Sequence, residues 1–174
     1  AHDHGVRVLL MKHQMLFQAL GKAVPVFAHL PLLLGTDGAK LSKRSSTDLT
    51  VVREFIEAGF LSQALVNFLM LLGWSHPEGL DQLTLADGIR SFSLERVKRT
   101  AAIFDTQKLK WLNGWWIRHL EVEELAEIAL GFAGEFRTEA EARGKSVWQR
   151  VVAELRSEMH VLTEVEGLAR LVFA

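Results

Sequence analysis

The chain has 174 residues, of which 49% are hydrophobic and 24% charged, the composition of a compact globular protein with one or two domains. Its 20 basic and 21 acidic residues give a net charge of -1, so contact with nucleic acid would have to come from local basic patches. Cysteine is absent, which excludes a disulfide framework, a Cys-based zinc site and a thiol nucleophile. We therefore expect a cytoplasmic protein.

The termini and the apolar runs bear on membrane association and completeness. No apolar run approaches the length of about 18 residues that a spanning helix requires, so we expect no membrane partner. The start, Ala1 to Gly5, has no initiator methionine and no signal-peptide pattern. We expect an internal slice of a larger gene product.

The first predicted elements are a helix and a strand. Apolar residues at helical spacing that stop at Gly21 predict a helix over residues 7–20 with a glycine C-cap. Residues 24–34 are apolar and bracketed by prolines, which favours a buried or edge strand. His29 within it is interpreted as a hydrogen-bonded core histidine rather than a catalyst.

A basic loop follows this strand. Lys40-Leu41-Ser42-Lys43-Arg44 places three cations within five residues, between upstream glycines and downstream hydroxyl groups. Such a loop suits the binding of a polyphosphate, because lysine supplies a compact charge and arginine a fixed donor fork. A solvated loop without function explains the same residues, since charge clusters alone say little. Ligands of open α/β sheets gather beyond the carboxyl ends of strands, which is where this loop starts.

After the loop the pattern is helical to the end of the chain. Ser62 is the expected N-cap of a helix that should be central to the core, and Asp105 is the expected N-cap of a longer one. The predicted helices cover residues 51–58, 62–73, 84–92, 93–99, 106–120, 121–132, 146–159 and 163–172. The chain is thus expected to be mainly α, with a short α/β piece at its start.

Five ordered motifs carry a family resemblance over roughly residues 12–120. They are Phe27 to Leu34, Lys40 to Arg44, Gly59 to Leu69, Leu72 to Ser75, and Phe104 to Gly114. In this order and spacing they closely resemble the bacterial-type glutamyl-tRNA synthetases. The helical pattern from Glu121 onward is unlike glutaminyl-tRNA synthetases, which carry β-barrels after the catalytic domain.

The resemblance implies a fold and a reaction. Residues 1–50 would be the C-terminal end of the class I (Rossmann) catalytic domain, 51–120 a helical stem-contact domain, and 121–174 the start of a helical anticodon-binding domain. The reaction would join glutamate to tRNA through a glutamyl adenylate, with ATP as substrate and Mg²⁺ accompanying it. Partners would be glutamate and tRNA, with tRNA-Glu expected and a monomer as the oligomeric state.

The resemblance also assigns the basic loop. Residues 40–44 would be the "KMSKS" signature that binds ATP, with Lys43 and Lys40 as catalytic cations. Leu41, Ser42 and Arg44 would complete the ATP-binding loop. Positioned cations suit this chemistry because pyrophosphate departure develops negative charge on phosphate oxygens.

Departures from the family pattern leave an alternative open. The His-Ile-Gly-His-like element of the family is absent, and residues 5–11 stand where the family carries an acidic residue and a small polar run, with which they do not align. By itself the chain is therefore expected not to aminoacylate. A non-catalytic tRNA-binding helical module of synthetase ancestry is the alternative, and a purely structural helical domain is a third.

Two further groups could contact tRNA. A basic region provides the predicted tRNA-binding residues Arg99, Lys108, Lys110 and Arg118, although a solvated helix face explains them too. Trp111, Trp115 and Trp116 could stack on bases, but packing is the preferred interpretation. The histidines lack metal-ligand spacing, so no protein-built metal site is predicted.

Overall fold

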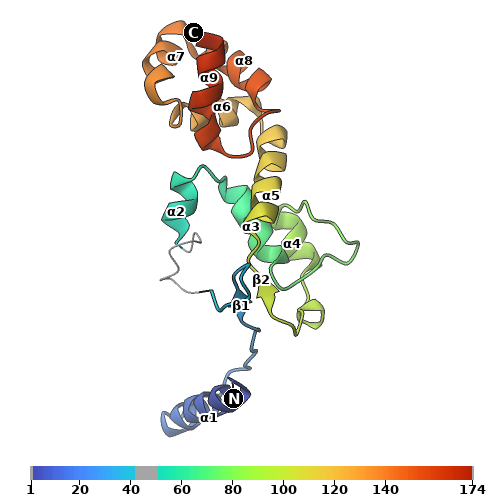
Figure 1. The fold of residues 1–174 in the computed structure, drawn as a ribbon. Coiled ribbons are helices and arrows are strands. Elements are labelled where there is room, and N and C mark those ends of the chain that lie inside the picture. Colours follow the sequence, from blue (N-terminus) through green and yellow to red (C-terminus); the bar gives the residue numbers. More distant parts are fainter. Residues whose placement is uncertain (1, 42–50, 174) are drawn as a thin grey trace. The chain divides into compact units, whose positions relative to one another are not determined.

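The computed structural model describes residues 2–41 and 51–173, and it describes residues 2–7 by their backbone only. The chain divides into two compact units, Ala1–Leu30 and Pro31–Ala174, and each is described by itself. The second unit holds the buried core and nearly all of the secondary structure (Figure 1).

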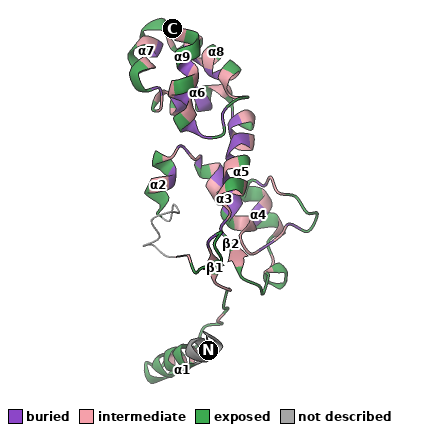
Figure 2. Ribbon diagram, viewed as in Figure 1, coloured by how far each residue is buried: buried purple, intermediate pink, exposed green. Residues whose placement is uncertain are grey.

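The first unit consists of one helix and an extended segment. Helix α1 spans His2–Ala19, so the predicted helix is confirmed but begins five residues earlier than expected. It ends in a glycine motif, in which Gly21, at a φ of 64°, donates to the carbonyl of Gln18 and Lys22 donates to that of Phe17. The large apolar side chains of α1 are exposed, as Figure 2 shows; they include Leu9, Met11, Met15 and Leu16.

The predicted strand over residues 24–34 is largely wrong. Only Leu33–Leu34 forms a strand, β1, which pairs in parallel with β2, Ala102–Ile103. Val26 is fully exposed and His29 is exposed, so the core interpretation of this histidine also fails. Pro25 removes a backbone donor, and in the described chain no strand pairs with residues 24–31.

The helical remainder is confirmed, with differences at the ends of elements. A 3₁₀ turn, Leu94–Arg96, replaces the helix predicted over 93–99. The helix Arg137–Arg143, which precedes Gly144, was not predicted. The helices of the second unit are α2 Val52–Glu57, α3 Ser62–Leu71, α4 Leu85–Ser91, α5 Thr106–His119, α6 Val122–Leu130, α7 Arg137–Arg143, α8 Lys145–Leu155 and α9 Val165–Phe173. Two more 3₁₀ turns cover Gly134–Phe136 and Leu162–Glu164.

Side-chain caps explain where two of these helices begin. Asp105 accepts hydrogen bonds from the backbone of Gln107 (2.9 Å) and Lys108 (3.2 Å), so the predicted cap of α5 is confirmed. Thr84 caps α4 through a reciprocal pair of bonds with Asp87. The prediction for Ser62 is wrong, because Leu61 is the N-cap residue of α3 and Ser62 is the first helical residue.

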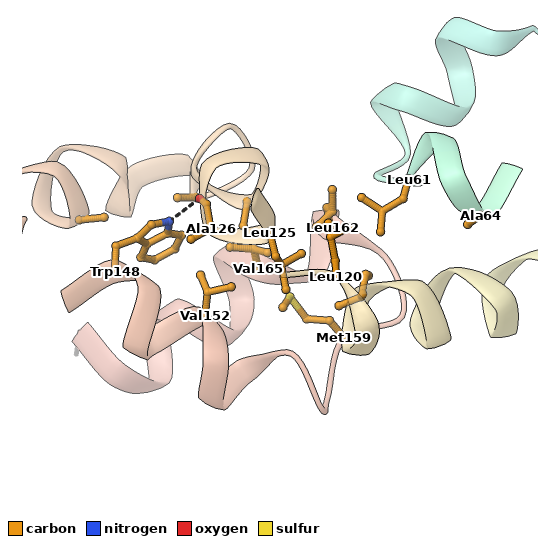
Figure 3. Close-up of a cluster of buried hydrophobic side chains, with 14 residues drawn as sticks. Leu61, Ala64, Leu120, Leu125, Ala126, Trp148, Val152, Met159, Leu162 and Val165 are labelled. Atoms are coloured by element: carbon orange, nitrogen blue, oxygen red, sulfur yellow. Dashed lines mark hydrogen bonds between the residues drawn. The ribbon is translucent and has the colours of Figure 1, made fainter. Parts of the chain in front are cut away.

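Two hydrophobic clusters stabilise the second unit. The larger one joins helices α6 to α9 with the ends of α3 and α5, and Figure 3 shows Val152, Met159 and Leu162 meeting inside it. The smaller one is built from Phe55, Phe68, Phe104, Leu109 and Leu112. Helices α3 and α5 contribute to both clusters and pack on each other, so they form the spine of this unit.

Helix α3 is less deeply buried than its apolar sequence suggests. Ala64, Asn67 and Phe68 are buried, but Leu69 keeps 50% of its surface exposed. The apolar residues on nearly every side of α3 therefore predict that it packs on α5, but they do not predict that part of α3 is exposed to solvent. Among the described residues, none of the helices has the length and apolarity needed to cross a membrane.

Candidate functional site

A tight hairpin at the end of β1 holds the start of the basic loop. Gly35 donates to the carbonyl of Ala39 (2.8 Å), and Leu41 donates to that of Leu33 (2.9 Å). Asp37 accepts a bond from the backbone of Ala39 (2.9 Å), and Lys40 pairs with Leu34 in an antiparallel bridge. We call residues 33–41 the β1 hairpin. It fixes the backbone of Lys40 at the carboxyl end of a strand, as the sequence predicted for this loop.

Only part of the predicted ATP-binding loop can be placed. Lys40 is exposed and Leu41 is half-buried, so the first cation of the loop faces solvent from a fixed backbone. Ser42, Lys43 and Arg44 lie outside the described residues. An exposed ammonium group at a strand end is available to an anionic ligand.

Strand pairing brings this hairpin next to a second basic segment. Leu34 lies opposite Ile103 in the parallel ladder, and its carbonyl accepts a bond from the backbone of Phe104 (2.8 Å). A cleft of about 300 Å³ lies along β2. Its lining includes the apolar residues Phe68, Leu71 and Leu72 and the charged residues Lys98, Asp105 and Lys108.

The four basic residues predicted to bind tRNA fall into two pairs. Lys108 is held by Asp81 (2.8 Å) and Lys110 by Glu164 (3.1 Å), so part of their charge is neutralised. Arg99 is exposed and Arg118 half-buried, and in the part of the chain that the structure describes neither forms an ion pair. The two arginines are therefore the better candidates for phosphate contact.

A buried amide joins α5 to two distant segments. Asn113, with no exposed surface, accepts a hydrogen bond from the backbone of Leu61 (2.7 Å) and donates to the carbonyl of His160 (2.7 Å). Leu162 donates to the carbonyl of Gly59 (2.9 Å), so the same segments also meet directly. We call these contacts among residues 58–61, Asn113 and residues 160–164 the α5 junction. It locks the chain just after α2 onto the C-terminal helices.

Glu164 completes the α5 junction electrostatically. Burial pushes the pKa of its carboxyl group upward, but hydrogen bonds from the backbone of His160, from Lys110 and from the backbone of Val161 outweigh it and hold the pKa below its ordinary value. The carboxylate is 2.7 Å from the backbone nitrogen of His160. It therefore stays charged and fixes the turn that carries His160.

The three tryptophans of α5 have different surroundings. Trp116 is half-buried and donates to the buried side chain of Asn67 (3.3 Å), which agrees with the packing interpretation. Trp115 stacks on His119 with ring centroids 4.0 Å apart. Trp111 keeps 46% of its surface exposed, so it is not part of the core of this chain.

Two residues of interest were not among the predicted site residues. Lys98 lines the cleft and was visible only as part of a basic stretch, whereas Trp111 was considered for base stacking but assigned to packing. Among the residues that the structure describes, no group of three or more His, Asp or Glu side chains could hold a metal ion.

Comparisons with known proteins place this geometry in a family. The model of the class I tRNA synthetases (E and Q), catalytic domain, matches residues 6–111, more than half of the chain. The match includes residues 6–11, which the motif comparison left unaligned.

Individual relatives agree with this match. Glutamate–tRNA ligase 1 of Fervidobacterium nodosum is 51% identical over 122 residues, covering 70% of this chain and 26% of that protein. Glutamate–tRNA ligase of Moorella thermoacetica is 38% identical over 166 residues, covering 93% of this chain and 33% of that protein. The crystal structure of glutamate-tRNA synthetase from Elizabethkingia anophelis matches with a TM-score of 0.69 and 23% identity, over 90% of this chain and 34% of that one. The chain thus spans about a quarter to a third of the length of these relatives.

Proposed function

The chain belongs to the class I tRNA synthetase family of the glutamate and glutamine enzymes, and from this premise we propose that it is part of a glutamate–tRNA ligase. The observation that carries the proposal is the β1 hairpin, which fixes the first lysine of Lys40 to Arg44 at a strand end. The relatives named glutamate–tRNA ligase supply the amino acid and the tRNA of the proposal.

The proposed reaction has two steps. A carboxylate oxygen of glutamate attacks the α-phosphorus of ATP, and pyrophosphate leaves with the bonding electron pair, which gives glutamyl adenylate. A terminal ribose hydroxyl of tRNA then attacks the acyl carbon, AMP leaves, and the hydroxyl proton passes to solvent. In the first step Lys43 and Lys40 stabilise the charge that grows on the departing pyrophosphate, while Arg44 and Ser42 hold the phosphates.

The remaining parts of the proposal concern partners and domains. Mg²⁺ would arrive with ATP and be held mainly by the phosphates. Arg99 and Arg118, neither of which forms an ion pair among the described residues, would meet tRNA phosphates, together with Lys98, which lines the cleft along β2. Residues 51–120 would act as the stem-contact domain and 121–174 as the start of the anticodon-binding domain, in a cytoplasmic monomer.

Exchange of labelled pyrophosphate into ATP tests this proposal, with glutamate and tRNA present, in a ligase that carries this chain. Lys43→Ala should slow the exchange by on the order of a hundredfold, the loss expected for one strong transition-state contact. Lys145→Ala, which removes an exposed cation on α8, is the matched control. Equal exchange rates for the wild type and Lys43→Ala would overturn the role of the loop.

A titration with tRNA separates the proposal from the alternative of a non-catalytic module. If the 174-residue chain binds tRNA with an affinity that ATP changes, the loop and the tRNA surface cooperate as the ligase proposal requires. If ATP leaves the affinity unchanged and no exchange occurs in the ligase, the module is the better description.

A further inference from the structure

The outer face of α5 gathers aromatic and basic side chains. At 100° per residue, Arg118, Trp111, Trp115 and His119 fall within an arc of about 100°, opposite the buried Leu109 and its neighbours. Trp111 is 46% exposed although tryptophan is usually well covered. We call these four side chains, together with His160, the α5 face.

Arg118 and His160 meet over a glycine on this face. A Cβ atom on Gly114 would lie 3.2 Å from Nη1 of Arg118 and 3.3 Å from Cδ2 of His160. The guanidinium group and the imidazole ring thus approach the same point on the helix surface. The α5 junction holds this arrangement from below, because Asn113 binds the carbonyl of His160 and Glu164 binds its backbone nitrogen.

A second contact orders the aromatic part of the face. The ring of Trp115 stacks on that of His119 with an interplanar angle of 17°, and Nδ1 of His119 lies 2.8 Å from the carbonyl of Trp115. The two rings therefore form a stacked pair whose first member, Trp115, lies one helical turn from Trp111. Preformed aromatic surfaces lose little conformational entropy when a planar ligand stacks on them.

The charge of the face selects the kind of partner. Helix α5 contains no acidic residue, and among the described residues Arg118 forms no ion pair, whereas Lys108, which falls within the same arc, and Lys110 are already paired. An exposed indole beside an unpaired guanidinium group suits a nucleobase next to its phosphate, since the ring stacks and the cation neutralises. An apolar protein partner would leave the guanidinium group desolvated without a counter-charge.

We propose that the α5 face is a tRNA-binding surface on which Trp111 stacks on an unpaired nucleotide while Arg118 and His160 contact the adjacent phosphate. This rests on the proposed function, which supplies tRNA as the nucleic acid. It moves the main contact from the paired lysines of α5 to an aromatic residue and an unpaired arginine.

The test is a titration of the 174-residue chain with a tRNA-Glu transcript at two salt concentrations. Trp111→Ala should weaken binding by on the order of tenfold, the scale of losing one stacked base. Arg118→Gln should weaken it severalfold and reduce the salt slope by about one. Phe92→Ala, with a 55% exposed aromatic residue, and Arg150→Gln, with an exposed arginine, should bind like the wild type. Unchanged binding by Trp111→Ala would overturn the proposal.

A spectroscopic measurement keeps the test decisive if Trp111→Ala folds poorly. In the 5-fluorotryptophan-labelled chain, the ¹⁹F signal of Trp111, assigned from Trp111→Phe, should shift on addition of tRNA, whereas that of the buried Trp148 should not. A Trp111 signal that responds only to protein concentration would mean a contact between chains and overturn the proposal.

The outcomes separate this inference from the proposed function. If the wild-type chain binds tRNA and Trp111→Ala binds equally well, the inference falls while the ligase proposal stands. If the α5 face binds tRNA as described but Lys43→Ala leaves the rate of pyrophosphate exchange unchanged, the ligase mechanism is refuted while the α5 face remains a tRNA-binding surface. A chain that binds no tRNA at all overturns the inference, and pyrophosphate exchange still decides the ligase proposal.

Discussion

The β1 hairpin and the α5 junction are both held by hydrogen bonds between the backbone and one side chain, but they differ in burial. In the hairpin Asp37 accepts one exposed bond and Lys40 faces solvent. In the junction Asn113 is fully buried and joins segments more than 45 residues away from it in sequence. Lys40, the first residue of the proposed ATP-binding loop, thus lies on an exposed hairpin, whereas the scaffold around α5 is held by a buried side chain. Changes in the hairpin should alter activity, and changes in the junction should alter stability.

The largest effect is expected for Asn113→Ala. It leaves the buried N–H of Leu61 and the carbonyl of His160 without their partner, each at a cost of about 1–3 kcal/mol, so we expect a loss of about 4 kcal/mol in the free energy of unfolding. Urea denaturation measures it, with Gln107→Ala, an exposed amide on the same helix, as the control. A loss below about 1 kcal/mol would contradict the locked junction.

Gly59→Ala should destabilise the protein by about 2–3 kcal/mol. The added Cβ would lie 2.6 Å from the backbone nitrogen of Thr163 and 2.7 Å from that of Leu162, and the φ of 83° adds strain for any other residue. Gly167→Ala in α9 is the control, because nothing lies within 4 Å of its Cβ position. Thermal unfolding of both variants checks the prediction, and equal melting temperatures would refute it.

Glu164→Gln should change how stability depends on pH. Because the pKa of Glu164 lies below its ordinary value of 4.5 in the folded state, its contribution is complete above pH 4.5 and is lost as the pH falls through the folded-state pKa. We expect less than about 1 kcal/mol, because the side chain keeps 33% of its surface exposed and solvent screens it.

The measurement is the difference in unfolding free energy between wild type and Glu164→Gln from pH 7 to pH 3. It should be constant down to about pH 4.5 and shrink below that value. Glu154→Gln, an exposed carboxylate on α8, gives the background. A difference that grew on acidification would contradict the assigned role.

The smallest effect on stability is expected for Asp37→Ala in the β1 hairpin. The lost bond to the backbone of Ala39 is exposed, so the free energy of unfolding should change by less than about 0.5 kcal/mol. Pyrophosphate exchange in a ligase that carries this chain should nevertheless slow severalfold, because the bond that holds the backbone of the residue before Lys40 is lost. Thr36→Ala, one residue earlier, is the control. A loss of stability without a change in the rate of pyrophosphate exchange would contradict the expectation that changes in the hairpin alter activity rather than stability.

Local signals made most of the helical fold predictable. The predicted glycine stop after α1 and the predicted cap at Asp105 are both present, because each acts through contacts within a few residues. The predicted cap at Ser62 is wrong because a distant contact takes part in fixing the start of α3. The backbone of Leu61 is bound by Asn113, a residue 52 positions away, which no local pattern reveals.

The sheet and the site were less predictable. An apolar run such as residues 24–34 predicts a strand. A strand also needs a second strand to pair with, and within this run only Leu33–Leu34 has one, Ala102–Ile103. The loop motif fixed the place of Lys40, yet the ion pairs that distinguish Lys108 and Lys110 from Arg118 depend on Asp81 and Glu164, which come from other elements. The sequence therefore located the basic residues but did not show which of them are neutralised by an ion pair.

The parallel pairing of β1 with β2 also bears on the order in which the protein forms. Leu33 lies opposite Ala102, so about 70 residues must be gathered before the ladder closes, and contacts across such loops form late in folding. Phe104, which follows β2, packs between Phe55 and Phe68, so the aromatic cluster and the ladder form together. We expect the basic loop to leave the ribosome before α5 and to gain its anchored lysine only after α5 has been made and has packed on α3.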